Sequence, residues 1–297
     1  MDAVIETSAL TKVWGDVTAV SDLNLRVEPG ECYAFLGRNG AGKSTTARML
    51  LDFIRPTRGS ARVLGGSGRD PSIRARVGYL PGDLNLPRAM TGGAAIAYYG
   101  KLQGGDHETE AASLVDRFGL DPDRPVRELS TGNRRKVGLV LAFMSRPELL
   151  ILDEPTSGLD PVLQEEFRNL LTERKQAGAS IWLTSHVMAE VERVADRVGL
   201  VRDGVLAEEL SMDTLRQQAT SRLRIGFPAP VDVAVLAGAA HVTSASAEGA
   251  TVLVSVNGPV TDLLRRAAEL GATTVETERR DLDEIFLELF DDKSHHQ

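Results

Sequence analysis

The sequence predicts an α/β domain followed by a small α+β domain, and three observations lead to this division. Short apolar runs alternate with helix-like stretches over residues 32–54 and 149–196, which is the rhythm of a parallel sheet. Residues 84–146 are helical in pattern and poor in strand signals. After about residue 220 the pattern changes to short strands separated by turns. We therefore place an α/β domain at 1–215, with a helical insertion at 84–146, and an accessory α+β domain at 220–297.

The elements of the first domain follow in order. Residues 1–30 alternate apolar and polar side chains and end in the turn signal PGE, which predicts antiparallel strands. The run CYAFLG is a short buried strand, and KSTTARMLLDFI after the glycine-rich loop is a helix. We expect three helices in GGAAIAYYGKLQ, HETEAASLVDRFG and NRRKVGLVLAFMS. The strand ELLILDEP, the helix VLQEEFRNLLTERKQAG, the strand SIWLTS and the helix VMAEVERVAD complete the domain.

The second domain is predicted from shorter signals. A strand in RLRIGF precedes a hairpin whose turn is Glu248-Gly249, and a helix near 260–270 leads to the strand TTVETE. A last helix over 282–290 carries an apolar stripe with helical spacing, formed by Leu282, Ile285, Phe286, Leu289 and Phe290. Two roles stay open for this helix: packing on its own sheet, or a regulatory or dimer contact.

Composition excludes several classes of protein. With 42% hydrophobic and 26% charged residues among 297, the chain has the composition of a globular protein. No run approaches the roughly 18 apolar residues of a membrane span, and the first 15 residues lack a secretory pattern, so we expect a cytoplasmic protein. The single cysteine, Cys32, lies in an apolar run and is expected to be buried rather than disulfide-bonded. The net charge of −8 argues against a nucleic-acid partner.

A glycine-rich loop between the first buried strand and its helix predicts a phosphate site. Its sequence from Gly37 to Ser44 satisfies G-x-x-x-x-G-K-S/T. Glycines let backbone N–H groups surround phosphate oxygens, and the helix start adds the positive end of its dipole. We expect Lys43 to reach the β- and γ-phosphates and the Ser44 hydroxyl to bind Mg²⁺.

Two carboxylates follow the strand LLIL, at the edge where open α/β sheets bind ligands. Adjacent strand residues point to opposite faces, so Asp153 and Glu154 have different tasks. We expect Asp153 to hold Mg²⁺ and Glu154 to orient or deprotonate an attacking water.

The chain resembles an ATP-binding subunit of an ABC transporter over about residues 3–215. Besides the two motifs above, Leu129-Ser130-Thr131-Gly132-Asn133 occupies the place of the family signature LSGGQ, although Thr131 and Asn133 depart from it. The resemblance implies a P-loop NTPase (RecA-like) core with an antiparallel β subdomain, and ATP and Mg²⁺ as cofactors. It implies that the nucleotide is held by a loop whose residues are Gly37, Arg38, Asn39, Gly40, Ala41, Gly42, Lys43, Ser44 and Thr45.

Five more site residues are implied by the resemblance. Ser130 and Gly132 are expected to contact the γ-phosphate of ATP held by the opposite subunit, and Ser130 also to cap a helix starting near Asn133. Asp160 in SGLD corresponds to the aspartate that crosses the dimer interface. His186 in LTSH corresponds to the switch histidine on the γ-phosphate, and Trp14 to an aromatic that stacks on adenine.

Two positions are ambiguous in the sequence. Gly82 stands where the family usually has a glutamine, so either Asp83 substitutes for it or the loop is a flexible joint, and we favour the joint. The basic run Arg134-Arg135-Lys136 is expected to be a solvated helix face rather than a nucleic-acid site.

The resemblance implies an ATPase subunit that dimerises head to tail, as a homodimer or a heterodimer, around two ATP molecules. It would energise a separate membrane permease from the cytoplasmic face of the membrane, for export of a drug-like or lipophilic substrate. Two alternatives are a non-transport ABC ATPase acting on ribosomes or DNA, and a degenerate regulatory cassette. A single cassette without a coiled-coil insertion argues against the first, and Glu154 argues against the second.

Overall fold

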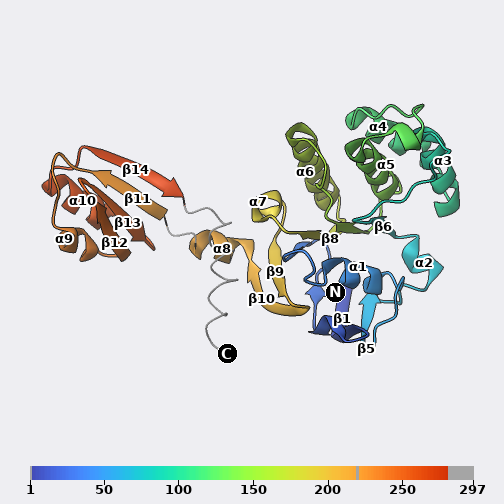
Figure 1. The fold of residues 1–297 in the computed structure, drawn as a ribbon, viewed down its shortest axis with the longest axis horizontal. Helices are drawn as coiled ribbons and strands as arrows, with labels where there is room; N and C mark the ends of the chain where they lie inside the picture. The colour runs from blue at the N-terminus through green and yellow to red at the C-terminus, as the bar shows by residue number, and fades with distance from the viewer. Residues whose placement is uncertain (1, 219–220, 280–297) are drawn as a thin grey trace. The chain divides into compact units, whose positions relative to one another are not determined.

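A computed structural model describes residues 2–218 and 221–279 of the chain (Figure 1). The chain divides into two compact units, Met1–Ser211 and Met212–Gln297. Each unit has its own sheet and apolar core, so each is described by itself.

A six-stranded sheet forms the centre of the first unit. Its strand order is β10-β9-β4-β8-β7-β6, and all neighbours are parallel except the β9-β10 pair. The strands are β4 (Cys32–Leu36), β6 (Val77–Leu80), β7 (Leu149–Asp153), β8 (Ser180–Ser185), β9 (Arg197–Arg202) and β10 (Val205–Ser211). The parallel sheet predicted from the alternation of strands and helices is confirmed.

The three middle strands β4, β8 and β7 are buried along their whole length. Burial of every residue fits a sheet covered on both faces. The rings of Phe35 and Trp182, from adjacent strands, pack with centroids 5.5 Å apart. Cys32 is fully buried, as expected, and burial raises the pKa of its thiol.

An antiparallel sheet lies beside this core. Strand β1 (Ile5–Trp14) pairs with β2 (Val17–Leu23), β3 (Arg26–Val27) and β5 (Arg58–Val63). The inward side chains of Ile5, Leu23 and Val63 join one apolar cluster with Phe35 and Trp182 of the six-stranded sheet. The two sheets therefore share a core, with α1 (Lys43–Leu50) packed against both β5 and β7.

The remaining helices gather on the opposite side of the central sheet (Figure 1). They are α3 (Gly92–Gln103), α4 (Glu108–Arg117), the short 3₁₀ turn Val126–Glu128, α5 (Thr131–Phe143), α6 (Pro161–Gln176) and α7 (Met188–Val191), while the single turn α2 (Pro71–Arg74) contacts β6. No helix in the described ranges, including those of the second unit, is long and apolar enough to span a membrane.

The helix expected in VMAEVERVAD is wrong in length, because α7 ends at Val191. The reason lies in the next strand. The Asp196 carboxylate accepts the N–H of Cys32 at 2.9 Å, and the Asp196 N–H donates to the Cys32 carbonyl at 2.8 Å. Asp196 is thereby held at the start of β4, so the chain leaves the helical path before it enters β9.

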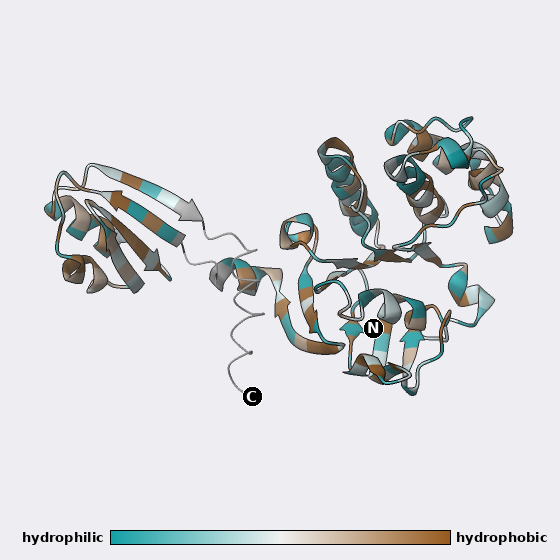
Figure 2. Ribbon diagram, viewed as in Figure 1, coloured by the Kyte–Doolittle hydropathy of each residue, from teal (hydrophilic) through white to brown (hydrophobic). Residues whose placement is uncertain are grey.

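The second unit begins with α8 (Met212–Gln218) and continues as a βαββαβ fold. Its elements are β11 (Ser221–Gly226), α9 (Val233–Ala237), β12 (Val242–Glu248), β13 (Thr251–Val256), α10 (Thr261–Glu269) and β14 (Thr274–Arg279). The antiparallel order β12-β13-β11-β14 is that of a split βαβ, ferredoxin-like sheet. Alternate residues of β11, visible as alternating colours in Figure 2, place Leu223 and Ile225 in the core. The helix expected over 282–290 lies outside the described residues.

Candidate functional site

The functional motifs meet at one edge of the central sheet. Strands β4, β8 and β7 are neighbours and run parallel, so their carboxyl ends lie side by side. The glycine-rich loop follows β4, Asp153 and Glu154 follow the apolar part of β7, and His186 follows β8. Segments more than 100 residues apart in the sequence therefore converge at the edge where such sheets bind ligands.

Backbone geometry explains the glycines of the loop. Gly40 and Gly42 have φ values of 85° and 99°, in the left-handed region. A Cβ atom at Gly42 would lie 2.3 Å from the Ala19 carbonyl oxygen, so this position accepts only glycine. Arg38 and Asn39 are exposed at the tip of the loop.

The start of α1 offers unpaired donors. The helix begins at Lys43, and Gly42 provides no side-chain cap for its first N–H groups. Ser44 and Thr45 are half-buried in this first turn, while Ala41 is buried beneath the loop. Such a helix start binds anions.

Lys43 is the buried cation of the site, with 5% of its surface exposed. Its Nζ donates to the carbonyl oxygens of Gly37 at 2.6 Å and Arg38 at 3.3 Å. The same Nζ lies 3.0 Å from Glu154 Oε1. Phosphate oxygens entering the loop would compete with these groups for the ammonium, which fits the role expected from the sequence.

Asp153 is the last residue of β7 and is 2% exposed. Its Oδ1 accepts a hydrogen bond from the Thr184 hydroxyl at 2.7 Å. A Cβ atom at Gly82 would lie 3.0 Å from Asp153 Oδ2, so the Gly82 backbone packs directly against this carboxylate. At position 82, where the family usually has a glutamine, the main chain therefore lies close to the Asp153 carboxylate.

Glu154 has a left-handed backbone, with φ of 49°. This conformation costs a non-glycine residue about 1–2 kcal/mol. Its Oε2 lies 2.7 Å from His186 Nδ1, and its Oε1 faces Lys43. The structure thus brings together the three predicted catalytic residues, with Glu154 19% exposed and His186 48% exposed on their side chains.

The signature segment has clear roles within its own chain. Ser130 caps α5 by accepting the Asn133 N–H at 3.2 Å, and the helix begins at Thr131, two residues before the expected start. A Cβ atom at Gly132 would lie 2.7 Å from the Gly158 carbonyl oxygen, so this glycine permits a close backbone contact. Asp160 caps α6 by accepting the Leu163 N–H at 3.0 Å.

Trp14 lies at the end of β1 and is 52% exposed. The Lys12 ammonium sits 4.1 Å from the centre of its ring and also donates to the Arg55 carbonyl at 2.8 Å. One face of the indole is therefore in contact with a fixed cation.

Sequence reasoning missed Arg135 and Thr184. The expected solvated face of residues 134–136 is wrong for Arg135, which is 4% exposed. Helix α5 is buried on most of its surface, and Arg135 lies four residues before the buried Leu139, on the same face. That spacing is a signal in the sequence. Thr184 lies near the end of the buried strand β8, and nothing in the sequence indicated its contacts with residues 153 and 154.

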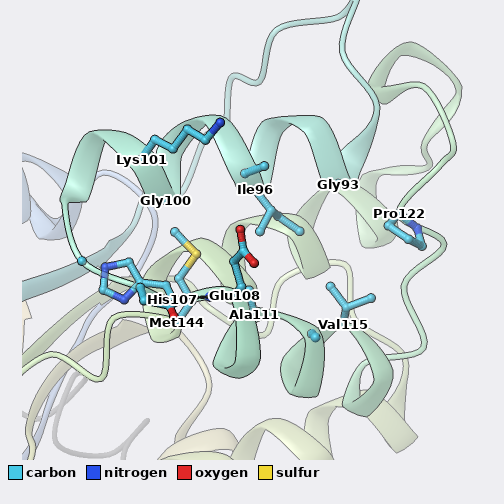
Figure 3. Close-up of a pocket in the computed structure, with 14 residues that line it drawn as sticks. Gly93, Ile96, Gly100, Lys101, His107, Glu108, Ala111, Val115, Pro122 and Met144 are labelled. Carbon is cyan, nitrogen blue, oxygen red and sulfur yellow. Dashed lines mark hydrogen bonds between the residues drawn. The ribbon is translucent and has the colours of Figure 1, made fainter.

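Two hollows lie near the helices α3–α5. A pocket of about 450 Å³ lies between residues 82–85 and the start of α5. A second, of about 630 Å³, lies between α3 and α4, where Ile96, Val115 and Met144 line it (Figure 3).

Comparisons with known proteins agree with this geometry. Residues 20–157 match the ABC transporter family. The bacitracin transport ATP-binding protein of Enterococcus faecalis is 30% identical in an alignment of 298 positions that covers 97% of either chain. The daunorubicin/doxorubicin resistance ATP-binding protein of Streptomyces peucetius is 33% identical in an alignment of 302 positions that covers 96% of this chain and 92% of that one.

A solved ATP-binding subunit of an ABC transporter is 28% identical, with a TM-score of 0.67 over 72% of this chain and 92% of that chain. A dimeric ATP-binding cassette bound to ADP and Pi is 20% identical, with a TM-score of 0.62 over 70% of this chain and 98% of that chain, and shares the fold. The phosphate loop, the paired acids and the relatives along nearly the whole chain lead to one conclusion: the chain belongs to the ATP-binding proteins of ABC transporters, a family of ATPases.

Proposed function

We propose that this chain binds and hydrolyses Mg-ATP to drive export of a drug-like or lipophilic substrate through a separate permease. The observation that carries the proposal is the convergence of Lys43, Glu154 and His186 at the ends of three adjacent strands. Relatives named for bacitracin transport and for daunorubicin/doxorubicin resistance support the export of such compounds.

The residues of the loop fit a nucleotide triphosphate. The uncapped start of α1 and the glycine backbone suit phosphate oxygens, and Lys43 supplies the compensating charge. Ser44 and Asp153 would hold Mg²⁺, since a hydroxyl and a carboxylate are hard oxygen donors of the kind that this ion takes together with phosphate oxygens. Bound Mg²⁺ would neutralise charge on the phosphates.

Glu154 fits the base that handles the attacking water. The Glu154 Oε1 atom is buried, and it pairs with the Lys43 ammonium 3.0 Å away. The other oxygen, Oε2, contacts His186 Nδ1 and is fixed by it. His186 thus holds one oxygen in place, and phosphate oxygens that draw the Lys43 ammonium away would leave the other free for a water molecule. The half-exposed His186 would contact the γ-phosphate.

A second ATP-binding subunit completes the proposed site. Ser130 and Gly132 at the start of α5, together with Asp160, would face nucleotide held by the opposite subunit. The exposed Trp14 offers its uncovered face to adenine. The permease would dock at the cytoplasmic membrane surface on the helices α3–α5, where the pocket drawn in Figure 3 lies between α3 and α4.

The catalytic assignment is tested with Glu154→Gln. This change keeps the shape of the side chain and removes the base, so turnover should fall about 10²- to 10⁴-fold while ATP affinity stays within a few-fold. Steady-state hydrolysis and titration of a fluorescent ATP analogue measure the two effects. With Mg-ATP the variant should also move from monomer to dimer in size-exclusion chromatography.

Glu148→Gln, one residue before β7, is the matched control and should hydrolyse ATP normally. Normal turnover in Glu154→Gln would place the base elsewhere. Affinity purification from membranes of the native host tests the transport assignment: a co-purifying integral membrane protein supports it, and ribosomes or DNA in its place would contradict it. Slower efflux of a lipophilic dye from cells that produce Glu154→Gln would support export.

A further inference from the structure

Arg135 lies buried on α5, and every donor of its guanidinium has an acceptor. Five N–H groups of an arginine radiate in a rigid plane. Here Nε donates to Pro155 O at 3.3 Å, Nη1 to Pro81 O at 2.6 Å and Gly82 O at 3.0 Å, and Nη2 to Asp153 O at 2.7 Å and to Glu154 O. The acceptors are all main-chain carbonyls, so this side chain holds the backbone of other segments.

These carbonyls belong to two separate segments. One is the loop after β6, at Pro81 and Gly82, and the other is the turn after β7, at residues 153–155. Arg135 joins the two because it reaches both with one planar group. Burial lowers the pKa of Arg135, and the nearby carboxylates of Asp153 and Glu154 oppose that shift.

Thr184 holds the same turn through other groups. Its hydroxyl, fully buried at the end of β8, accepts the Glu154 N–H at 2.9 Å and donates to Asp153 Oδ1 at 2.7 Å. One hydroxyl therefore orients the carboxylate of the first acid and the main chain of the second. Valine would have nearly the same shape and neither hydrogen bond.

The two side chains together account for the unusual backbone at Glu154. Its N–H is held by Thr184 and its carbonyl by Arg135, and the Ser157 N–H donates to the same carbonyl at 3.1 Å. A left-handed conformation at a non-glycine residue persists only where its surroundings over-determine it. That conformation turns the Glu154 side chain toward Lys43 and His186.

We propose that Arg135 and Thr184 are positioning residues for hydrolysis: they clamp the turn at residues 153–155 so that the Glu154 carboxylate faces the phosphate site. Arg135 also joins this turn to the loop at 81–82, so that a shift of that loop is transmitted to Glu154. Among the described residues, neither side chain hydrogen-bonds to the phosphate loop. The inference rests on the proposed role of Glu154 in hydrolysis.

Thr184→Val is the first test. At saturating Mg-ATP, turnover should fall about 10- to 100-fold, the range for losing a group that orients a functional side chain. The affinity for the fluorescent ATP analogue should stay within about threefold. Thr184→Ser restores the hydroxyl and should recover most of the turnover. Thr172→Val, at an exposed position on α6, is the matched control.

A double-mutant cycle separates positioning from general structural damage. If Thr184 acts through Glu154, adding Thr184→Val to Glu154→Gln should change the residual turnover by less than about twofold. A further loss equal to that of the single Thr184→Val variant would overturn the proposal. Normal turnover in Glu154→Gln alone would instead contradict the proposed function, so the two failures are distinguishable.

Arg135→Lys tests the link between the two segments. Lysine carries three donors on a point charge and cannot reproduce a planar set of five. Turnover should fall at least tenfold, with ATP affinity retained. Thermal unfolding followed by tryptophan fluorescence should remain cooperative. Wild-type turnover in a folded Arg135→Lys protein would remove Arg135 from the proposal. Should this variant fail to fold, the Thr184 variants and the cycle still decide between positioning and structure.

Discussion

The two units of the chain bury different kinds of side chain. Ten polar or charged residues are buried in the first unit, among them Lys43, Arg135, Asp153 and Thr184. The described part of the second unit buries none, and its core of residues such as Leu223, Val254 and Leu263 is entirely apolar. Both units are built from strands and helices with regular patterns. They differ in what their cores contain besides apolar groups.

Burying a polar group costs free energy unless hydrogen bonds compensate for it. In the first unit the compensation is local, since Lys43, Arg135 and Thr184 all contact the turn at residues 153–155. The second unit carries no comparable cluster in its described residues. The contrast supports nucleotide chemistry in the first unit, and the predictions below separate what each unit contributes.

Lys43→Ala should have the largest effect. Removing one partner of a buried charge pair costs 2–5 kcal/mol or more, so ATP affinity should fall about 10³-fold. Titration with a fluorescent ATP analogue measures the change. Lys101→Ala, at an exposed lysine of α3, should bind normally. Equal affinity in wild type and Lys43→Ala would end the assignment of the phosphate loop.

Ser130→Arg should lower turnover about 10²-fold, because a misplaced group at a composite site disrupts geometry, while binding to the monomer stays nearly intact. Ser246→Arg, at an exposed position of β12, should have no effect on either quantity. Mixing Lys43→Ala with Ser130→Arg subunits assembles one complete site per mixed dimer, and partial turnover should return. Full activity of the Ser130→Arg variant on its own would show that Ser130 serves only as the cap of α5.

Leu263→Ala should destabilise the second unit alone, by at least about 2 kcal/mol, since a fully buried leucine leaves a cavity. Tryptophan fluorescence reports on the first unit alone, because both tryptophans and all four tyrosines of the chain lie before residue 212. Hydrogen exchange over residues 221–279 should increase, while the unfolding midpoint from tryptophan fluorescence and the ATP affinity stay unchanged. A matching shift of the tryptophan midpoint would show that the two units unfold together.

Asp262→Asn should have the smallest effect on stability. The effect should be present above about pH 4, neutral pH included, and should disappear at lower pH. The pKa of Asp262 is lowered to about 2, below its ordinary value of 3.8, by the Ala240 N–H first and then by Arg265. A lowered carboxyl pKa stabilises the folded unit above pH 4, and this contribution is lost as the pH falls from about 4 to 2. The urea midpoint of residues 221–279, followed by pulsed hydrogen exchange, should therefore lose part of its acid dependence in the variant.

The regular elements were predictable because their signals are local. The strand SIWLTS and the helix GGAAIAYYGKLQ have the predicted bounds, since period and flanking turn residues decide them. The parallel sheet followed from the alternation of strands and helices, and the apposition of the phosphate loop with Asp153 and Glu154 followed from the placement of each motif directly after a strand.

Other features depend on contacts between distant segments. Arg135 was placed on a solvated face because its neighbours Arg134 and Lys136 are basic, but the carbonyls that surround it come from residues 81–82 and 153–155. The left-handed φ of Glu154 has no sequence signature. The early end of α7 reflects the tie between Asp196 and Cys32, which lies 164 residues away. Such contacts are invisible to periodicity.

The contact between Gly132 and Gly158 has a mechanical consequence. With no side chain at Gly132, the first turn of α5 rests on the main chain of the loop before α6, where a Cβ atom would approach the Gly158 oxygen to 2.7 Å. Two surfaces in such contact slide or separate, but they cannot be pushed closer. A displacement of α5 toward this loop would therefore also displace the loop, because no space separates the two backbones at this point.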